Sequence, residues 1–522
     1  MAAREQEREL KFTPGPSFRA GDVVERLPGL RPGEPSTRTL HATYYDTADL
    51  RLARTGASLR WRDDQGWMVK LPAAGSEGGL LSRDEITVEG PAPVTGGGAP
   101  GGGGAVPAAA LDLVHALVRS APIDAVAKLV SVRNRVDLFD ADDRKVAEMV
   151  DDEVSVLDGN HLLSRFREVE VELTKHAGAD LADELVAALR AAGAGRPDPV
   201  PKIVRALGPR AAEPPDLGEP EKLDEASFPV DVLRAAIVRS TRRLVAHDPG
   251  VRTGHDMEDV HQARVATRRL RSDLRTFAVV VESAWNDALR DELKWLGDLL
   301  GAVRDTDVLL ERLERRLATL ESADEEAGHR LLDGLHAKRD AARDALLAAM
   351  RGPRYLALLD RLHDAARRVP GPLDARDLGV EVADLVRPPW HKLRRAADAL
   401  DDESPDPDLH HVRILAKRCR YAAEAVAPAI GKDAVRFAKQ VAALQDVLGE
   451  HQDAVIAGQW LRQHASDAIL QGGGEGAAAV AFVAGELAML ELAAADASRE
   501  LWPEAWHLAR AKRLRRWMRS GR

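Results

Sequence analysis

The hydrophobic period changes once along this chain of 522 residues, and that change limits the folds it can adopt. Up to about residue 207, short segments such as 57–62, 86–88 and 166–173 alternate apolar and polar residues, as strands do. From about residue 228, long segments rich in Ala, Leu, Arg and Glu have the 3.6-residue spacing of helices. Residues 208–227 are Pro-rich and acidic and predict a linker. We expect a strand-rich region, 1–207, followed by an all-helical region, 228–522.

Composition narrows the class of protein. The chain has 74 Lys and Arg against 84 Asp and Glu, so its net charge of −10 makes nucleic acid an unlikely partner of the whole surface. Its one cysteine, Cys419, excludes a disulfide within the chain. The N-terminus lacks the apolar stretch of a signal peptide, and no run is expected to approach the 18 apolar residues of a membrane span. These features predict a cytoplasmic protein with no membrane partner.

Charged side chains share one face of the predicted N-terminal strands. In a strand, Glu7, Glu9 and Lys11 lie on the same face because successive side chains alternate. The same alternation groups Arg60 with Arg62, Arg133 with Arg135, and Glu168 with Glu170 and Glu172. In a closed barrel this face could line a lumen where carboxylates hold a hard divalent cation and Arg and Lys hold a polyanion, which favours a metal-bound polyphosphate. The alternative is an open sheet with cross-strand ion pairs at its surface.

At these residues the sequence resembles the CYTH domain, or triphosphate tunnel metalloenzyme fold. Glu7-x-Glu9-x-Lys11 is similar to the E-x-E-x-K signature of that family. Further similar segments follow in order, at 44–47, 59–62, 69–71, 83–85, 168–172 and 201–207. The resemblance covers residues 1–207 and implies an antiparallel eight-stranded β tunnel barrel with Mg²⁺ or Mn²⁺ as cofactor.

The resemblance also implies roles for individual residues. Those with a catalytic role are Glu7, Glu9, Lys11 and Lys70, and Lys70 is either a general base, if the tunnel lowers its pKa, or only a phosphate ligand. The implied metal ligands are Glu7, Glu9, Glu168, Glu170, Glu172 and Asp151. The implied triphosphate ligands are Lys11, Arg60, Arg62, Lys70, Arg133, Arg135 and Lys202.

The helical region contains an internal repeat. His261-x-x-Arg264 recurs as His410-x-x-Arg413 at an offset of 149 residues, and the segment 300–305 recurs at 448–453. The repeat predicts two halves, about 228–370 and 371–522. On a helix, the basic residues of each copy form one stripe and apolar residues such as Ala266 and Leu270 form another. A row of like charges needs either acidic neighbours or a bound polyanion to compensate it.

These repeated motifs resemble the CHAD domain, a helical domain defined by histidines and basic residues. The resemblance covers about 228–522 and implies two pseudo-symmetric four-helix bundles that bind inorganic polyphosphate. The implied polyphosphate ligands are His261, Arg264, Arg268, Arg269, Arg271, Arg275, His410, Arg413, Lys417, Arg418 and Arg420. The basic C-terminal stretch 510–522 could extend this surface, bind nucleic acid nonspecifically or be a solvated end.

Together, the sequence patterns and the two resemblances predict an α+β multidomain protein. Its expected activity is metal-dependent hydrolysis of inorganic triphosphate in the tunnel, with inorganic triphosphate and polyphosphate as partners. One alternative is a non-catalytic polyphosphate-binding protein that targets polyphosphate granules. Others are further tunnel-family activities, namely thiamine triphosphatase or class IV adenylyl cyclase.

Overall fold

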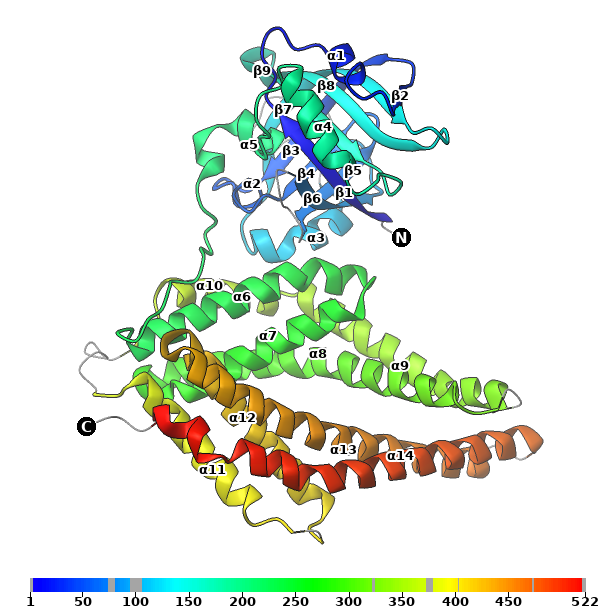
Figure 1. Cartoon of the computed structure of the whole chain (residues 1–522), viewed down its shortest axis with the longest axis vertical. Coiled ribbons are helices and arrows are strands. Elements are labelled where there is room, and N and C mark those ends of the chain that lie inside the picture. The colour runs from blue at the N-terminus through cyan, green and yellow to red at the C-terminus, as the bar shows by residue number, and fades with distance from the viewer. Residues whose placement is uncertain are drawn as a thin grey trace. The chain divides into compact units, whose positions relative to one another are not determined.

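The computed structural model describes residues 3–73, 80–93, 106–321, 324–371, 379–401, 403–471 and 474–518. The chain forms two compact units, Met1–Gly218 and Glu219–Arg522 (Figure 1). Their boundary falls inside the acidic, Pro-rich segment 208–227.

The first unit is mainly β-structure. Its strands are β1 (Ala3–Phe12), β2 (Arg31–Pro32), β3 (Ser36–Asp46), β4 (Ser58–Arg62), β5 (Gly66–Pro72), β6 (Leu80–Val88), β7 (Asp124–Phe139), β8 (Lys145–Asp158) and β9 (His161–Leu173). Its helices are α1 (Ala20–Val24), α2 (Arg51–Arg54), α3 (Ala108–Val118), α4 (Leu181–Ala191) and α5 (Lys202–Leu207), followed by the 3₁₀ turn η1 (Pro209–Ala212).

Eight of the strands in the described part of this unit close into a barrel. The pairing order is β7-β3-β4-β5-β6-β1-β9-β8, and β8 pairs again with β7, while the two-residue β2 adds to β7 alone. Every pairing is antiparallel. A closed barrel leaves no exposed edge and gives each strand an inner and an outer face. The predicted antiparallel eight-stranded barrel is confirmed.

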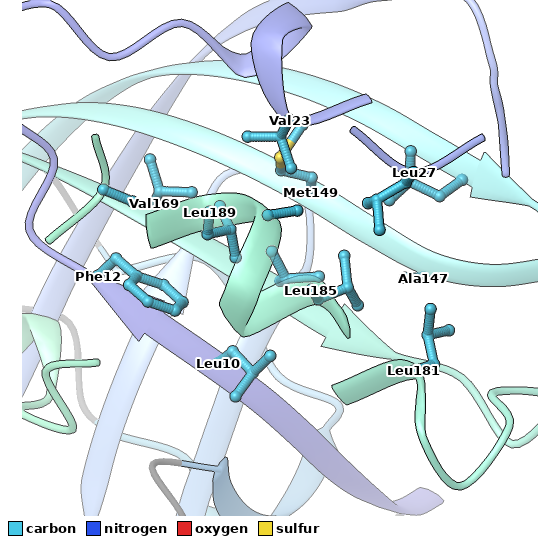
Figure 2. Packing of buried hydrophobic residues seen from close by; sticks show 14 of the residues in the cluster. Leu10, Phe12, Val23, Leu27, Ala147, Met149, Val169, Leu181, Leu185 and Leu189 are labelled. Carbon is cyan, nitrogen blue, oxygen red and sulfur yellow. The ribbon is translucent and has the colours of Figure 1, made fainter. Parts of the chain in front are cut away.

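The outer faces of the strands are apolar and are covered by helices. Leu10 and Phe12 of β1 pack with Val169 of β9 and Met149 of β8 beneath Leu185 of α4 (Figure 2). On another side of the barrel, α3 covers β4, β5 and β6 through a second buried cluster. Because these apolar residues alternate with charged ones along each strand, burying them turns the charged residues inward.

Apolar side chains fill one end of the barrel interior. Tyr44, Leu129, Val154 and Val156 cluster there with Ile203 of α5. The inner faces of β7, β8 and β9 are charged farther along the same strands, at Arg133, Asp152 and Glu170 among others. The interior therefore divides into an apolar end and a charged cavity.

The second unit is helical. Its helices are α6 (Pro229–Thr253), α7 (Met257–Thr276), α8 (Ser283–Leu317), α9 (Glu325–Arg351), α10 (Pro353–Arg367), α11 (Arg387–Ala397), α12 (Asp406–Ile430), α13 (Lys432–Gln471) and α14 (Glu475–Ala509). Three 3₁₀ turns, η2 (Ala278–Val280), η4 (Val382–Val386) and η5 (Lys512–Met518), complete the described elements. The predicted order, a β barrel followed by an all-helical region, is confirmed.

The helices follow the sequence repeat. In the first half, α6, α7, α8 and α9 pack in succession and α10 then packs on α6, while in the second half α11, α12, α13 and α14 pack in succession and are followed by η5. The two motif helices, α7 and α12, contact each other. The predicted apolar stripe of α7 is buried, as are Val412, Leu415, Cys419 and Ala422 of α12. The buried stripes leave the basic faces of both helices available for a site.

The expectation that no segment approaches a membrane span was wrong, because one helix is long and apolar enough to cross a membrane by length and composition alone. α14 contains an 18-residue window with a mean hydropathy of 1.8, of which 28% is buried. The helix packs along α13, and Leu487 and Val483 belong to a cluster with α8 and α9 (Figure 1). Its buried Glu491 accepts hydrogen bonds from Arg312 and Arg316 of α8. One face of α14 contributes to this core, while large apolar side chains on it such as Phe482 and Met489 are exposed.

Candidate functional site

The barrel contains a cavity of about 290 Å³ whose walls are mostly charged. Of the residues predicted from sequence, it is lined by Lys11, Arg60, Arg62, Lys70, Arg133, Arg135, Glu170, Glu172 and Lys202. Charged or polar residues that were not predicted as site residues also line it, among them Arg38, Tyr44, Arg83, Glu85 and Glu148. Glu7, Glu9 and Glu168 are buried beside these lining residues and contact them.

The two signs of charge are unevenly distributed around the barrel. The carboxylates of the strands lie on β6, β1, β9 and β8, whereas five of the six arginines among the described lining residues lie on β7, β3 and β4 and the sixth, Arg83, lies on β6. Arg60 of β4 donates to Tyr44 Oη at 3.4 Å, Gln65 Oε1 at 3.4 Å and Met68 Sδ at 3.3 Å, none of which is a carboxylate. A buried guanidinium with only neutral partners still has a full charge to offer to an anionic ligand.

One group of carboxylates is formed by Asp152, Glu168 and Glu170. Each offers an oxygen that lies within 4.8 Å of the others, and all three side chains are buried. Lys202 Nζ contacts all three, at 2.6 Å from Asp152, 3.0 Å from Glu168 and 3.7 Å from Glu170. Lys11 Nζ lies 2.6 Å from Glu170, and Arg133 donates to both oxygens of Asp152 at 2.9 and 2.7 Å. Cations from β1, β7 and α5 thus converge on carboxylates from β8 and β9.

The structure corrects the prediction for Asp151 by one residue. Asp151 points to the outer side of β8, where Arg167 donates to it at 2.8 and 2.6 Å. Asp152 is the next residue of β8, so its side chain points inward because successive side chains of a strand point to opposite faces. Glu170 is also inward, on the adjacent β9. Alternation along β9 predicts the inward residues of β9 alone. The pairing of β8 with β9 was needed to show that Asp152, rather than Asp151, faces the lumen.

A second group of carboxylates surrounds Lys70. Its ammonium donates to both oxygens of Glu7 at 2.9 Å and also ion-pairs with Glu85. Glu172 lies beside Glu7, and burial together with this neighbouring carboxylate raises the pKa of Glu172 to about 8. Glu9 stands between the groups, 3.9 Å from Lys11 and 3.8 Å from Arg83. The predicted acidic residues of β1 and β9 therefore do come together in the lumen.

The acidic wall fits a hard divalent cation. Glu9 Oε1 and Glu168 Oε2 are buried carboxylate oxygens that accept no hydrogen bond from the residues described. Burial also raises the pKa of Glu168, with Lys202 opposing and Glu170 reinforcing that effect. Oxygen ligands of this kind are the ones that Mg²⁺ and Mn²⁺ prefer, and a cation would relieve the repulsion among the carboxylates.

Lys70 is not a neutral amine in this setting. Burial lowers the pKa of Lys70, but the carboxylates of Glu7, Glu85 and Glu9 together outweigh that effect, and the pKa lies above its ordinary value. The carboxylates of Glu170 and Glu9 likewise raise the pKa of Lys11 against the effect of burial. In this arrangement the direction of the shift favours the alternative in which Lys70 is a phosphate ligand over the one in which it is a general base.

The helical unit contains a separate basic groove of about 390 Å³ between α7 and α8 of the first half and α12 and α13 of the second. It is lined by six of the predicted basic residues, His261, Arg264, Arg268, His410, Arg413 and Lys417, together with Arg304 and Arg312. The two copies are equivalent in detail. Arg264 donates to Asp305 at 2.6 Å, and Arg413 lies 3.7 Å from Asp453 at the matching position of the repeat. The acidic residues thus orient arginines of the groove.

The remaining predicted basic residues lie outside the lining of this groove. Arg269 and Arg420 both ion-pair with Glu424 and lie over the ring of Tyr421. Arg271, Arg275 and Arg418 form a further group on α7 and α12. Burial, followed by Arg418, Arg290 and Arg271, lowers the pKa of Arg275 to about 10. Sequence spacing predicted a stripe for nine of the eleven residues, and the resemblance added Arg269 and Arg418, whereas six of the eleven line the groove.

Comparisons with known proteins match the two units separately. A CYTH domain matches residues 5–204, and a CHAD domain matches residues 235–462. The uncharacterized protein Rv2226 of Mycobacterium tuberculosis is 33% identical over 497 residues, which cover 89% of this chain and 89% of that protein. Human thiamine-triphosphatase is 40% identical over 84 residues, 16% of this chain and 34% of that enzyme.

Among solved structures, the CHAD domain of the plant Ricinus communis is 29% identical and covers 55% of this chain and 96% of that domain, with a TM-score of 0.43. The mycobacterial relative is similar over both units and over nearly its whole length. The chain belongs to the family of proteins in which a CYTH domain is followed by a CHAD domain.

Proposed function

We propose that the barrel hydrolyses the terminal phosphoanhydride bond of inorganic triphosphate with Mg²⁺ or Mn²⁺, and that the helical unit binds inorganic polyphosphate. The observation that supports the first part is the uneven distribution of charge in the cavity, with carboxylates on β6, β1, β9 and β8 and five of the six described lining arginines on β7, β3 and β4. An anion alone would be repelled by the first wall, and a metal alone would leave the second wall unused. A metal-bound phosphate chain uses both.

The residues that would hold the metal are Asp152, Glu168 and Glu170, joined by Glu7, Glu9 and Glu172. A bound divalent ion supplies charge neutralisation at the phosphate oxygens and a water of lowered pKa. Opposite, Arg60 and Arg62 line the cavity and are placed to bind phosphate oxygens. Arg60 has only neutral partners, whereas Arg62 pairs with the loop residue Asp64 at 2.5 Å. Lys11, Lys202 and Arg133 line the cavity and contact the carboxylates, so they can bridge the two walls.

Such a site works by positioning and charge neutralisation. In the reaction, a water oxygen forms a bond to the terminal phosphorus while the bond from that phosphorus to its bridging oxygen breaks. Lys70, Arg60 and Arg133 supply fixed positive charge where negative charge develops on the leaving and peripheral oxygens. Tyr44 is the one aromatic residue among the cavity-lining residues described, and this scarcity of aromatic faces favours an inorganic chain over a nucleotide.

Phosphate release from inorganic triphosphate, ATP and thiamine triphosphate would test the proposal, with Mg²⁺, Mn²⁺ or EDTA present. We expect metal-dependent release, fastest from inorganic triphosphate. Asp152→Asn and Glu9→Gln should each lower kcat/KM for it by about 100-fold or more, since each removes charge that neutralises the reacting groups. The matched control is Glu153→Gln, because Glu153 is exposed beside Asp152 on β8 and faces away from the cavity.

Thermal melting of each variant separates loss of function from loss of folding. No release from any of the three substrates by the folded wild-type chain would reject hydrolysis and leave polyphosphate binding as the function. Release that persists in EDTA, or that Asp152→Asn leaves unchanged, would reject the acidic wall as the metal site. Preference for thiamine triphosphate would keep the site and change the substrate.

A further inference from the structure

A second basic pocket, distinct from the groove, lies in the helical unit where the C-terminal turn η5 meets α11. It has a volume of about 460 Å³ and is lined by the nitrogen-bearing side chains of Arg387, His391, Arg394, Lys512, Arg515 and Arg516. It shares no lining residue with the groove between α7 and α12. Part of the basic C-terminal stretch noted in the sequence thus forms a pocket wall, while Arg519 and Arg522 lie outside the described residues.

Packing holds this pocket together. Arg387 at the start of α11 donates to the backbone oxygen of Met518 in η5 and ion-pairs with Asp384 at 3.0 Å. The Arg515 guanidinium lies 4.6 Å from the ring centroid of Trp390 in α11. On the other side of η5, Trp517 packs edge-on against Phe437 of α13 at 6.1 Å. The segment 512–518 is therefore docked on the second half, so the solvated-end interpretation does not hold for it.

Arg387 is paired with Asp384, but three other basic side chains of the pocket have no acidic partner in the described part of the chain. No Asp or Glu is among its described lining residues. Arg394, Lys512 and Arg516 form no ion pair with any residue in the described part of the chain, and Arg394 and Arg516 are exposed. Cations held near one another by packed elements repel, and a polyanion that binds several of them relieves the repulsion. The pocket is thus built for an anion with several charges.

The aromatic residue in the wall indicates which kind of anion fits. Trp390 is 2% exposed, and its ring packs against Arg515, Phe437 and Trp506, so it offers no open face on which a nucleobase could stack. Its buried Nε1 donates to no acceptor among the described residues. An indole N–H and several guanidinium groups all donate, and none of them accepts. Phosphate oxygens only accept, whereas a nucleobase needs both kinds of partner.

We propose that this pocket binds a short inorganic phosphate chain, independently of the groove and of the barrel. Arg394 of α11 and Lys512 and Arg516 of η5 bind successive phosphate groups from two sides. The proposal rests neither on hydrolysis in the barrel nor on polyphosphate binding between α7 and α12, because it uses none of their residues.

Hydrogen–deuterium exchange of the full chain, read by mass spectrometry, tests the pocket locally. Inorganic triphosphate is added in EDTA, which prevents metal-dependent hydrolysis. We expect exchange to slow several-fold in peptides that cover 387–397 and 510–518. The variant Arg394→Ala/Arg516→Ala should lose this protection. The matched control Arg395→Ala/Arg513→Ala removes two exposed arginines from the same two elements without touching the pocket lining and should keep it.

Further variants and ligands identify where the protection from exchange originates. In the groove variant Arg264→Ala/Arg413→Ala, protection of 387–397 and 510–518 by triphosphate should persist. Loss of protection there would show that the pocket responds only to the groove, and would overturn the proposal. If the pocket variant and its control lost protection equally, the protection would come from the overall positive charge rather than from the pocket. That result would also overturn the proposal. Protection by a single-stranded oligonucleotide but not by triphosphate would assign nucleic acid instead.

Discussion

Lys417 of α12 is a cation packed among cations. Burial and the neighbouring Arg268, Arg413, Arg264 and Arg420 lower its pKa to about 7. It lines the groove between α7 and α12. A polyanion in the groove would add negative charge beside Lys417 and raise this pKa, so binding must take up a proton wherever the free group is neutral.

This argument predicts how polyphosphate affinity depends on pH. The free Lys417 is charged below pH 7 and loses its charge above it, so affinity should fall as pH rises from about 7, by at most about tenfold per pH unit. Titration calorimetry with long-chain polyphosphate in buffers of different ionisation enthalpy would measure both affinity and proton uptake. Burial, reinforced by nearby arginines, lowers the pKa of His261 and His410 in the free groove.

Two substitutions at the same position are the controls. Lys417→Arg keeps the charge over the whole range, so it should bind at pH 6 as the wild type does and lose the pH dependence above 7. Lys417→Met should bind more weakly at pH 6 and show no dependence in this window. A wild-type affinity that is constant from pH 6 to 9 would contradict the role of Lys417 in the groove.

The strand β1 and the helix α4 illustrate how one secondary-structure element positions the cavity. Leu10 and Phe12 of β1 pack beneath α4, while Glu9 and Lys11, which alternate with them along the strand, face the lumen. Leu185 is fully buried at this contact (Figure 2). Any loss of packing at α4 therefore acts on the strand that carries the predicted signature residues.

Leu185→Ala should destabilise the barrel unit by about 2–5 kcal/mol, the usual result of a cavity left by a buried leucine. Glu184→Ala, an exposed neighbour on α4, should change its free energy of unfolding by less than about 0.5 kcal/mol. Pulse proteolysis in urea reports each unit as a separate band and measures both values. An equal effect of the two substitutions would contradict the packing of α4 on the barrel.

The whole chain is built as two units with separate cores. The buried clusters of the barrel draw on residues before 218, and the cluster of α8, α9, α13 and α14 draws on residues after 219. Cleavage at a protease site introduced within 219–222 should therefore give two fragments that stay folded and monodisperse. Metal-dependent phosphate release should remain with the first fragment and polyphosphate binding with the second. Aggregation of either fragment after cleavage would show that the cores depend on each other.

The sequence by itself was sufficient for the features that depend on local periodicity. Alternation along β1, β4 and β9 predicted which faces carry Glu9, Arg60 and Glu170, because side-chain direction in a strand follows from position alone. The 149-residue repeat likewise predicted that α7 and α12 are equivalent helices with buried apolar stripes. These predictions do not require knowing which element packs against which.

Only the tertiary structure decided the properties that arise between elements. The register of β8 on β9 chose Asp152 over Asp151, the carboxylate of Glu7 raised the pKa of Lys70, and the docking of η5 on α11 made a pocket from a basic terminus. Each depends on distances across the chain, and electrostatic interactions vary with distance and burial rather than with sequence separation. The sequence determined which groups are available in this protein, and the fold decided which of them meet.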